Sequence, residues 1–277
     1  MKTRVVIALL LAGLFASPLA RAQVPTNSLT LWLDAGAITG LSDGQAVPVW
    51  TNKGPLVAAN MTQGDSAKQP IYKTGVANGQ PAVRFDGIND YIVGLAANNY
   101  ITASDFTLFT VFNAASLTRN EAGVWNNHKV VGDSAGYFGH LVSSNAPGAG
   151  LAYVYNYDGT ADIVAAPINA GAWYAISSRH SGGSLFSRLN AGAEGSTTSG
   201  NTALLTGLLQ VGSGEDGPYL DADFHGDIAE VLIYNTALSA ADQSTVQEYL
   251  FAKYGVPEPS SAALLALCAV LLWRQRG

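Results

Sequence analysis

The sequence predicts an all-β sandwich that carries one helix near its C-terminal end. Three observations lead to this prediction: short β-branched and aromatic runs bounded by turn residues, tight-turn signals between such runs, and a single well-capped helical pattern. Strands do not alternate with helices along the chain, and this argues against a parallel α/β sheet.

Several short runs have the composition of strands. The segments LTLWLD (29–34) and PAVRF (81–85) are rich in β-branched, leucine and aromatic residues. The run FTLFTVFNA (106–114) is apolar on both faces, which indicates a central strand that is covered on two sides. Its apolar residues divide into Phe106, Leu108 and Phe112 on one face and Phe109 and Val111 on the other.

Two hairpins follow from turn residues. Asp158-Gly159 lies between LAYVYNY and TADIVAA, and it accepts the positive φ angles of a type I′ turn. A second hairpin joins AWYAISSRH to SLFSRLN through Ser181-Gly182-Gly183. Both pairs should therefore form antiparallel ribbons.

The helical pattern lies near the end of the chain, in LSAADQSTVQEYLFAKYG. Ser239 is expected to be the N-cap, with Asp242 completing a pair similar to a capping box. Gly255 supplies the left-handed stop, and Pro257 prevents continuation. The helix should therefore end before residue 255.

Composition limits the function classes. The chain has 277 residues, of which 48% are hydrophobic and only 12% are charged. Its formal net charge is −6, whereas nucleic-acid binding needs a basic surface, so no nucleic-acid partner is expected. The single cysteine, Cys268, lies close to the C-terminus, so the main domain must fold without disulfides.

The N-terminal segment predicts export. Lys2 and Arg4 precede an apolar run, and Ala20-Arg21-Ala22 fits a cleavage site for a secretory signal peptide. Residues 1–22 are therefore interpreted as the signal peptide and residues 23–255 as one exported domain.

Within that domain, successive blocks resemble the laminin-G-like domains of the concanavalin A-like jelly-roll sandwiches. The blocks are LTLWLDA with SDGQAVPVWTNKG, GQPAVRFDGINDYI, AWYAISSRHSGGSLFSRLNAG and FHGDIAEVLIYNTALSAADQSTVQEYLFAKYG. The resemblance implies a jelly-roll β-sandwich with one C-terminal helix. One departure is that Asn52 stands where relatives often have an acidic residue, in the pattern W-x-D-x-S-G.

Residues 256–277 resemble the PEP-CTERM sorting signal of Gram-negative bacteria. The segment contains Pro257, Glu258 and Pro259, then an apolar run, then the basic residues Arg274 and Arg276. The resemblance implies a hydrophobic sorting helix, transient insertion into the inner membrane, and an exosortase-type processing enzyme as partner. The arginines would hold the end of that helix on the cytoplasmic side. The expected destination is the cell surface or the extracellular space.

The sequence gives little sign of catalysis. The string Gly132-Asp133-Ser134-Ala135-Gly136 matches a nucleophile elbow, but a strand-like segment follows it where that motif requires a helix. Glycoside hydrolysis needs two carboxyl groups about 5–9.5 Å apart. Laminarinase-type enzymes of the fold that this sequence resembles place them on one strand as E-x-D-x-x-E, and no such string occurs here. Glu230 is the glutamate that lies deep in an expected strand. It could line a binding face, but we interpret it as a structural residue whose partners are neighbouring backbone groups. In a regular strand Asp227 would point to the opposite face from Glu230.

A calcium site is one interpretation of the acidic loops. Asp221, Asp223 and Asp227 cluster along the chain, and Asp86 and Asp90 lie in FDGINDY. Calcium prefers such oxygen ligands, but aspartate is also an ordinary turn residue. The four histidines lack the paired spacing of a zinc site.

Aromatic side chains suggest a glycan-binding surface. Tyr153, Tyr155 and Tyr157 share one face of an expected strand, and Trp125 and Trp173 are further candidates, although such rings also fill sandwich cores. The leading hypothesis is a non-catalytic module that binds extracellular polysaccharide or mediates adhesion. A divergent polysaccharide hydrolase or lyase and a purely structural matrix protein stay open as alternatives.

Overall fold

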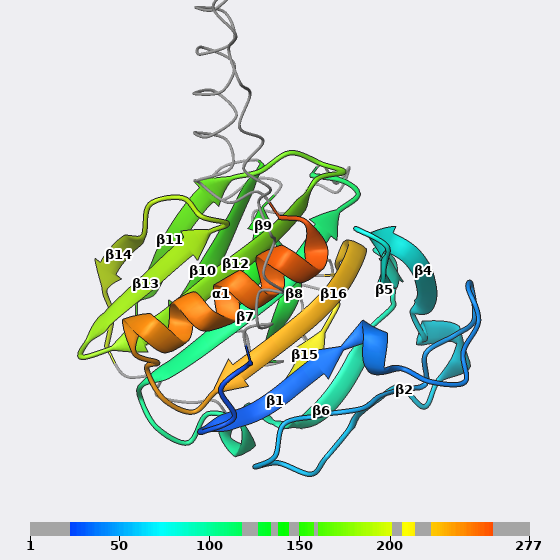
Figure 1. Ribbon diagram of the computed structural model, residues 1–277, viewed down its shortest axis with the longest axis horizontal. Coiled ribbons are helices and arrows are strands. Elements are labelled where there is room, and N and C mark those ends of the chain that lie inside the picture. The colour runs from blue at the N-terminus through cyan, green and yellow to red at the C-terminus, as the bar shows by residue number, and fades with distance from the viewer. Residues whose placement is uncertain are drawn as a thin grey trace, which may run out of the picture.

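The computed structural model describes residues 23–117, 127–133, 138–143, 150–157, 160–200, 207–213 and 223–256. Within these residues the chain forms two antiparallel sheets and one α-helix, as the sequence predicts (Figure 1). The architecture is consistent with a jelly roll. The expected signal peptide lies outside the described residues, and so does the expected sorting segment beyond Val256. No helix in the described part of the chain is long and apolar enough to cross a membrane.

The first sheet, sheet A, has eight strands in the order β14-β13-β12-β7-β16-β5-β4, with β1 paired to β16. β1 and β5 occupy the same edge of β16, because β5 pairs with its first residues and β1 with its last. The bounds are β1 Leu29–Asp34, β4 Ile71–Ala77, β5 Gln80–Asp86, β7 Phe106–Ala114, β12 Trp173–Ser181, β13 Ser184–Leu189, β14 Gly195–Thr198 and β16 His225–Tyr234.

The second sheet, sheet B, also has eight strands, in the order β11-β10-β9-β8-β15-β6-β3-β2. Its strands are β2 Val49–Trp50, β3 Met61–Thr62, β6 Ile92–Ala96, β8 Asn127–Asp133, β9 Phe138–Ser143, β10 Leu151–Tyr157, β11 Ala161–Pro167 and β15 Leu208–Val211. Three short 3-10 helices connect strands: η1 Ala35–Ala37, η2 Ser66–Lys68 and η3 Ala97–Asn99.

Both predicted hairpins are present. β10 pairs with β11 from Leu151↔Pro167 to Tyr157↔Ala161, and β12 pairs with β13 up to Ser181↔Ser184. In the second hairpin Gly182 and Gly183 have φ angles of 57° and 78°, as a type I′ turn requires. The Asp158-Gly159 turn itself lies outside the described residues.

Helix α1 (Ala240–Tyr254) lies across the outer face of sheet A, over β12, β7 and β16 (Figure 1). The Ser239 hydroxyl accepts a hydrogen bond from the Asp242 amide at 3.1 Å and donates one to the Asp242 carboxylate at 2.8 Å. Gly255 ends the helix with φ 65°. The predicted cap and stop are confirmed.

Sheet A is buried on both faces, because the helix covers the face that sheet B does not. One apolar cluster lies between the sheets and a second lies between sheet A and α1. β7 contributes to both, with Phe106, Leu108 and Phe112 in the first and Phe109 and Val111 in the second. This is the division that the two-sided apolar pattern of 106–114 predicts.

The core between the sheets also contains a chain of polar side chains. His140 on β9 is 1% exposed, and its ring nitrogens lie 2.9 Å from the Thr110 hydroxyl and 2.8 Å from the Ser178 hydroxyl. Ser178 in turn donates to the Ser187 hydroxyl at 3.0 Å. Burial lowers the pKa of His140 to about 3, so the imidazole is neutral at physiological pH.

Candidate functional site

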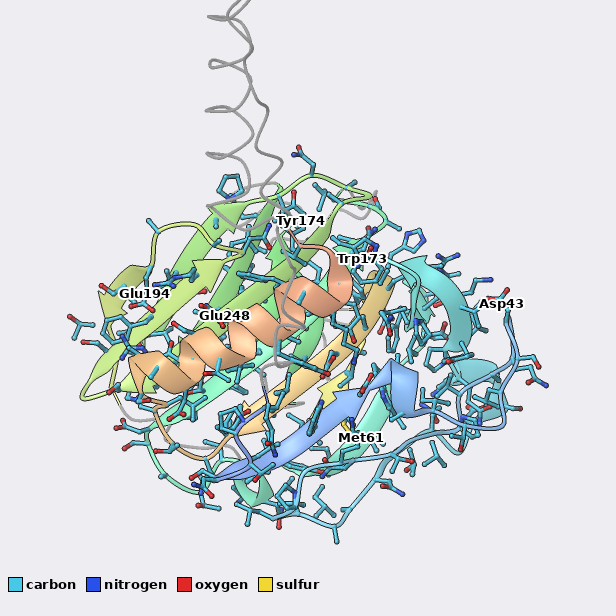
Figure 2. The ribbon with its side chains drawn as sticks, in the orientation of Figure 1. Asp43, Met61, Trp173, Tyr174, Glu194 and Glu248 are labelled. Carbon is cyan, nitrogen blue, oxygen red and sulfur yellow. The ribbon has the colours of Figure 1, made fainter. Side chains whose placement is uncertain are left out.

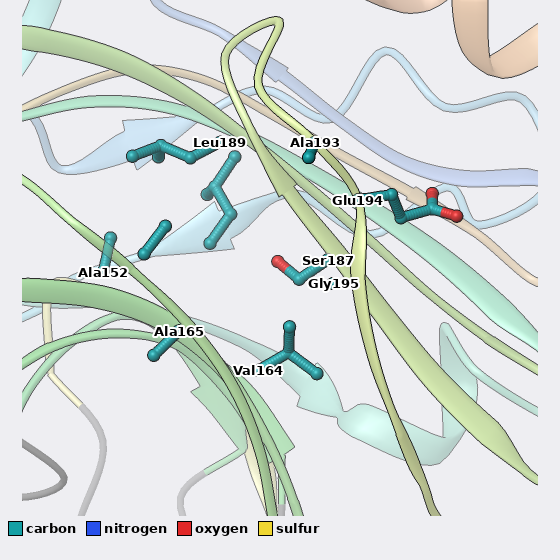
Figure 3. A pocket seen from close by; sticks show the side chains of 10 residues that line it. Ala152, Val164, Ala165, Ser187, Leu189, Ala193, Glu194 and Gly195 are labelled. Atoms are coloured by element: carbon teal, nitrogen blue, oxygen red, sulfur yellow. The ribbon is translucent and has the colours of Figure 1, made fainter.

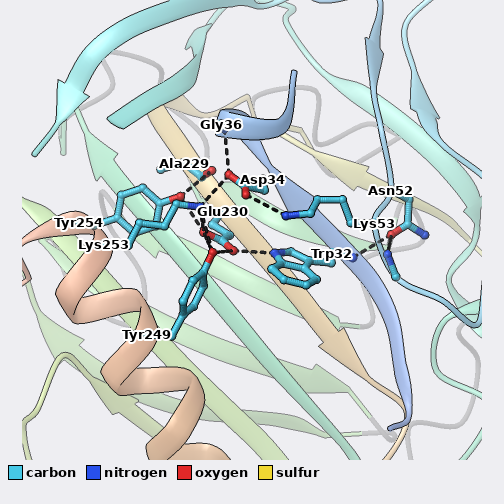
Figure 4. Close-up of polar contacts among 11 residues, drawn as sticks. Trp32, Asp34, Gly36, Asn52, Lys53, Ala229, Glu230, Tyr249, Lys253 and Tyr254 are labelled. Carbon is cyan, nitrogen blue, oxygen red and sulfur yellow. Dashed lines mark hydrogen bonds and ion pairs between the residues drawn. The ribbon is translucent and has the colours of Figure 1, made fainter. Parts of the chain in front are cut away.

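A buried polar network joins α1 to sheet A around Glu230 of β16 (Figure 4). The Glu230 side chain is fully buried, and a carboxylate in that position is stable only when donors surround it. Four donors reach its two oxygens: Trp32 Nε1 at 2.6 Å, Tyr249 OH at 3.0 Å, Lys253 Nζ at 2.8 Å and Tyr254 OH at 2.7 Å.

Asp34 of β1 extends the network. Lys253 Nζ also donates to Asp34 Oδ1 at 2.8 Å, and Lys53 Nζ donates to Asp34 Oδ2 at 3.0 Å. Lys53 lies 3.8 Å from the centre of the Trp32 ring, in a cation–π contact. Two lysines therefore face two carboxyl groups in this cluster.

The two carboxyl groups respond to this environment in opposite directions. Burial opposes the ionisation of Asp34, but attraction by Lys253 and Lys53 outweighs it, so the pKa of Asp34 lies below its usual range. Burial raises the pKa of Glu230 above its usual range, against the attraction of Lys253. Burial, together with the negative charge of Glu230, likewise raises the pKa of Tyr254, so the phenol stays protonated and donates. The arrangement suits a structural anchor for α1.

The prediction that Asp227 and Glu230 point to opposite faces of β16 is wrong. The register of β16 against β7 shifts between Ile228 and Glu230, which marks a β-bulge. Ile228 therefore lies in the core between the sheets, whereas Ala229 and Glu230 both face α1. Asp227 also lies on the α1-side face, because its cross-strand partner Arg84 alternates with core-facing residues of β5.

Asp227 belongs to an ion pair. Arg84 Nε and Nη2 bind its two carboxylate oxygens at 2.7 and 2.9 Å. This bidentate pair occupies both oxygens, so Asp227 has a partner without any metal ion. Of the other residues expected at a calcium site, Asp221 lies outside the described residues and Asp223 is 8% exposed.

Asp86 and Asp90, which also belong to the calcium interpretation, lie at the rim where β5 ends. Asp90 is 8% exposed and accepts a hydrogen bond from the Asp86 amide at 3.0 Å. Burial, with repulsion by Asp86 and Asp223, raises the pKa of Asp90 to about 6. Across the described ranges, however, no group of three or more histidine, cysteine or acidic side chains has the geometry to hold a metal ion.

The three tyrosines of β10 differ in exposure. Ala152 and Val154 of this strand face the core, so Tyr153 and Tyr155 lie on the outward face of sheet B. Tyr153 is 1% exposed, and burial raises the pKa of its phenol. Tyr155 is half-buried. The side chain of Tyr157 lies outside the described residues.

The tryptophan candidates give no exposed platform in the described part of the chain. Trp173, at the start of β12 (Figure 2), is half-buried against the cluster under α1, and its Nε1 donates to the Val76 carbonyl at 3.0 Å. Trp125 lies outside the described residues.

Asn52 organises the loop that holds Lys53 beside the network. Its side-chain oxygen accepts from the amides of Trp32 and Gly54, each at 2.8 Å. Its nitrogen donates to the carbonyls of Thr30 at 3.1 Å and Val57 at 2.7 Å. A carboxylate could make the first two bonds but not the last two, since it has no donor. Asparagine therefore has a structural role at the position where relatives often have an acidic residue.

The network that sequence reasoning missed has partners on β1, β16, α1 and the loop at Lys53. The sequence predicts a structural role for Glu230, with donors from the neighbouring backbone. The observed donors are all side chains, and three of them come from aromatic residues. A local signal exists in the spacing of Tyr249, Lys253 and Tyr254, which places them together on one side of a helix.

Solved structures share the fold at low sequence identity. Trypanosoma rangeli sialidase in complex with sialic acid aligns with a TM-score of 0.55 and 14% identity over 81% of this chain, which spans only 33% of the sialidase. Domain 4 of AbnA, an extracellular arabinanase from Geobacillus stearothermophilus, in complex with arabinotriose, aligns with a TM-score of 0.52 and 13% identity over 81% of this chain and 98% of that domain.

The binding domain of Paraclostridial Mosquitocidal Protein 1 aligns with a TM-score of 0.55 and 13% identity, over 82% of this chain and 52% of that one. Comparison with curated proteins gives no significant match. A laminin-G-type family model, described as concanavalin A-like lectin/glucanases superfamily, matches residues 86–242, more than half of the chain. The chain therefore belongs to the concanavalin A-like lectin/glucanase superfamily.

Proposed function

We propose that this domain is an exported, non-catalytic module that binds extracellular polysaccharide on the outward face of sheet B. The observation that carries the proposal is the state of Glu230. Glu230, the glutamate that lies deep in a strand, is fully buried beneath α1 and accepts hydrogen bonds from four side chains. A group in this position cannot reach a glycosidic bond.

Two further observations support binding over cleavage. The arabinanase domain that shares the fold over 98% of its length is described in complex with arabinotriose, and another neighbour is a binding domain. On this chain, Tyr155 offers a half-buried ring on the face of sheet B opposite the core, where a ring can stack on a sugar. Tyr153 contributes packing beneath that surface, since it is 1% exposed.

The test is a panel of polysaccharides, arabinan included, in affinity electrophoresis together with an assay for new reducing ends. We expect retention by at least one polysaccharide and no release of reducing ends. Tyr155→Ala should weaken retention several-fold, because an aromatic contact contributes about 1 kcal/mol. Tyr91→Ala, which changes another half-buried tyrosine, is the matched control and should leave retention unchanged. Reducing ends released by the purified domain would replace the binding proposal with an enzymatic one.

We further propose that residues 1–22 direct export and that residues 256–277 act as the sorting segment. The support is the order of Pro257-Glu258-Pro259, apolar run and arginines in the sequence. In a host with an exosortase-type enzyme, intact-mass analysis of the surface protein should show that residues 274–277 are missing. Recovery of a C-terminal peptide that contains Arg274 and Arg276 from the mature protein would contradict processing.

We also propose calcium binding at the acidic rim, on the support of the acidic sequence pattern. Asp223 belongs to that pattern, and its charge acts on Asp90 at the rim. Millimolar calcium should raise the melting temperature by mass action, and EDTA should reverse the shift. Asp223→Asn should abolish the calcium response. Asp227→Asn should instead lower the melting temperature in both conditions while the calcium response persists, since Asp227 is held by Arg84. A melting curve that calcium leaves unchanged would exclude the site.

A further inference from the structure

A cavity of about 180 Å³ lies between the two sheets at the edge formed by β11, β13 and β14 (Figure 3). The cavity opens to solvent at this edge, where Ala165, Ala193 and Glu194 of its lining are exposed. For comparison, an apolar cavity of about 150 Å³ is large enough to bind benzene. The space here is therefore sufficient for a small organic group.

Most of the side chains that line the cavity are apolar. Val164 and Ala166 come from β11, Ile176 from β12 and Leu189 from β13, while Ala152 of β10 lies behind them. The alanines leave the room that larger side chains would fill. Glu194 lies at the margin, where its carboxylate points away from Ala152 and binds Arg179 Nη2 at 3.1 Å (Figure 3). An anionic ligand would lose its hydration in such a cavity without gaining a charged partner.

Two side chains of the lining are polar: Glu194 at the margin and Ser187, whose hydroxyl faces the space between the sheets (Figure 3). Ser187 is 7% exposed and accepts a hydrogen bond from Ser178. Because Ser178 uses its proton on Ser187, the neutral His140 donates to Ser178 through Nε2 and accepts from Thr110 through Nδ1. Thr110, His140 and Ser178 each donate their hydrogen to the next side chain, which leaves the hydroxyl hydrogen of Ser187 at the end of the chain.

The hydroxyl hydrogen of Ser187 itself finds no acceptor among the described residues. The chain from Thr110 through His140 and Ser178 therefore fixes Ser187 as a donor at the cavity wall. The ligand that complements a single donor in an apolar cavity is a small neutral group with one acceptor oxygen.

We propose that this cavity binds a short neutral acyl group, in the form of an ester or an amide. Its carbonyl oxygen accepts a hydrogen bond from Ser187, and its alkyl chain packs against Val164, Ile176 and Leu189. This site lies between the edges of the two sheets and does not depend on glycan binding at the outward face of sheet B.

The probe is methyl butyrate, and its matched control is sodium butyrate, which has the same alkyl chain but a charged carboxylate. Titration is followed through the side-chain methyl resonances of Ile176 and Leu189. We expect saturable shifts with methyl butyrate in the millimolar range and none with butyrate. Equal binding of the two compounds would overturn the proposal.

Two variants test the geometry. Ser187→Ala should weaken binding of methyl butyrate about five-fold, the usual effect of losing one neutral hydrogen bond. Ala166→Leu fills the cavity and should abolish saturable binding; if that variant does not fold, Ala166→Val should weaken binding in the same direction. Undiminished binding by Ser187→Ala, or by a folded cavity-filling variant, would contradict the proposed site.

Discussion

Replacement of Lys253 by methionine should lower the free energy of unfolding by about 3–5 kcal/mol, because it leaves buried Glu230 and Asp34 without their shared cation. The side chain of Lys253 is 5% exposed, so water cannot compensate for the loss. Chemical denaturation followed by circular dichroism measures the change.

Lys53→Met is the matched control, since Lys53 also binds Asp34 but its side chain is 33% exposed. It should cost about 1 kcal/mol or less, as is usual for exposed pairs. Adding Glu230→Gln to Lys253→Met should recover part of the loss, because the second substitution removes the unpaired charge. If Lys253→Met costs no more than Lys53→Met, the network does not anchor the helix.

Acidification should destabilise the domain through His140 well before most carboxylates become protonated. The pKa of His140 falls from 6.5 to about 3 on folding, so between these values the unfolded chain binds a proton that the folded chain excludes. Above pH 6.5 His140 is neutral in both states and does not reduce the free energy of unfolding. Below pH 6.5 the free energy of unfolding falls with the pH. The loss is about 1.4 kcal/mol per pH unit, or about 3 kcal/mol at pH 4.5.

The measurement is the free energy of unfolding against pH for the wild type, His140→Gln and His225→Gln. His140→Gln should be less stable by about 1–2 kcal/mol at pH 7, because it alters the bonds to Thr110 and Ser178. The difference in free energy of unfolding between His140→Gln and the wild type should shrink as the pH falls to 4.5. The variant His225→Gln, at an exposed position, should show the same dependence of that free energy on pH as the wild type. Parallel curves for the wild type and His140→Gln would show that His140 does not cause the acid sensitivity.

Local signals in the sequence predicted most of the fold. The cap at Ser239, the stop at Gly255 and the two-sided apolar pattern of 106–114 each depend on residues within one element, so their physical cause is visible in the sequence. The resemblance to laminin-G-like domains then identified the sandwich as a whole.

The arrangement around Glu230 could not be predicted in the same way. Its face depends on a bulge in β16, and no glycine or proline at that point in the sequence marks the extra residue. Its donors come from Trp32, nearly two hundred positions earlier in the chain, and from the last turns of α1. Contacts between such distant residues follow from strand register and helix placement, which a single sequence does not specify.

The position of this network has a mechanical consequence. The described part of the chain ends at Val256, directly after Lys253, Tyr254 and the helix stop at Gly255. A pulling force applied through the C-terminal segment would therefore reach the final turn of α1 first. There it would have to break the contacts of Lys253 and Tyr254 with Glu230 before it could peel the remainder of the helix from sheet A. The buried ion pair and hydrogen bonds of the helix thus stand at the point where tension enters, so a domain held by its C-terminus would resist unravelling from that end.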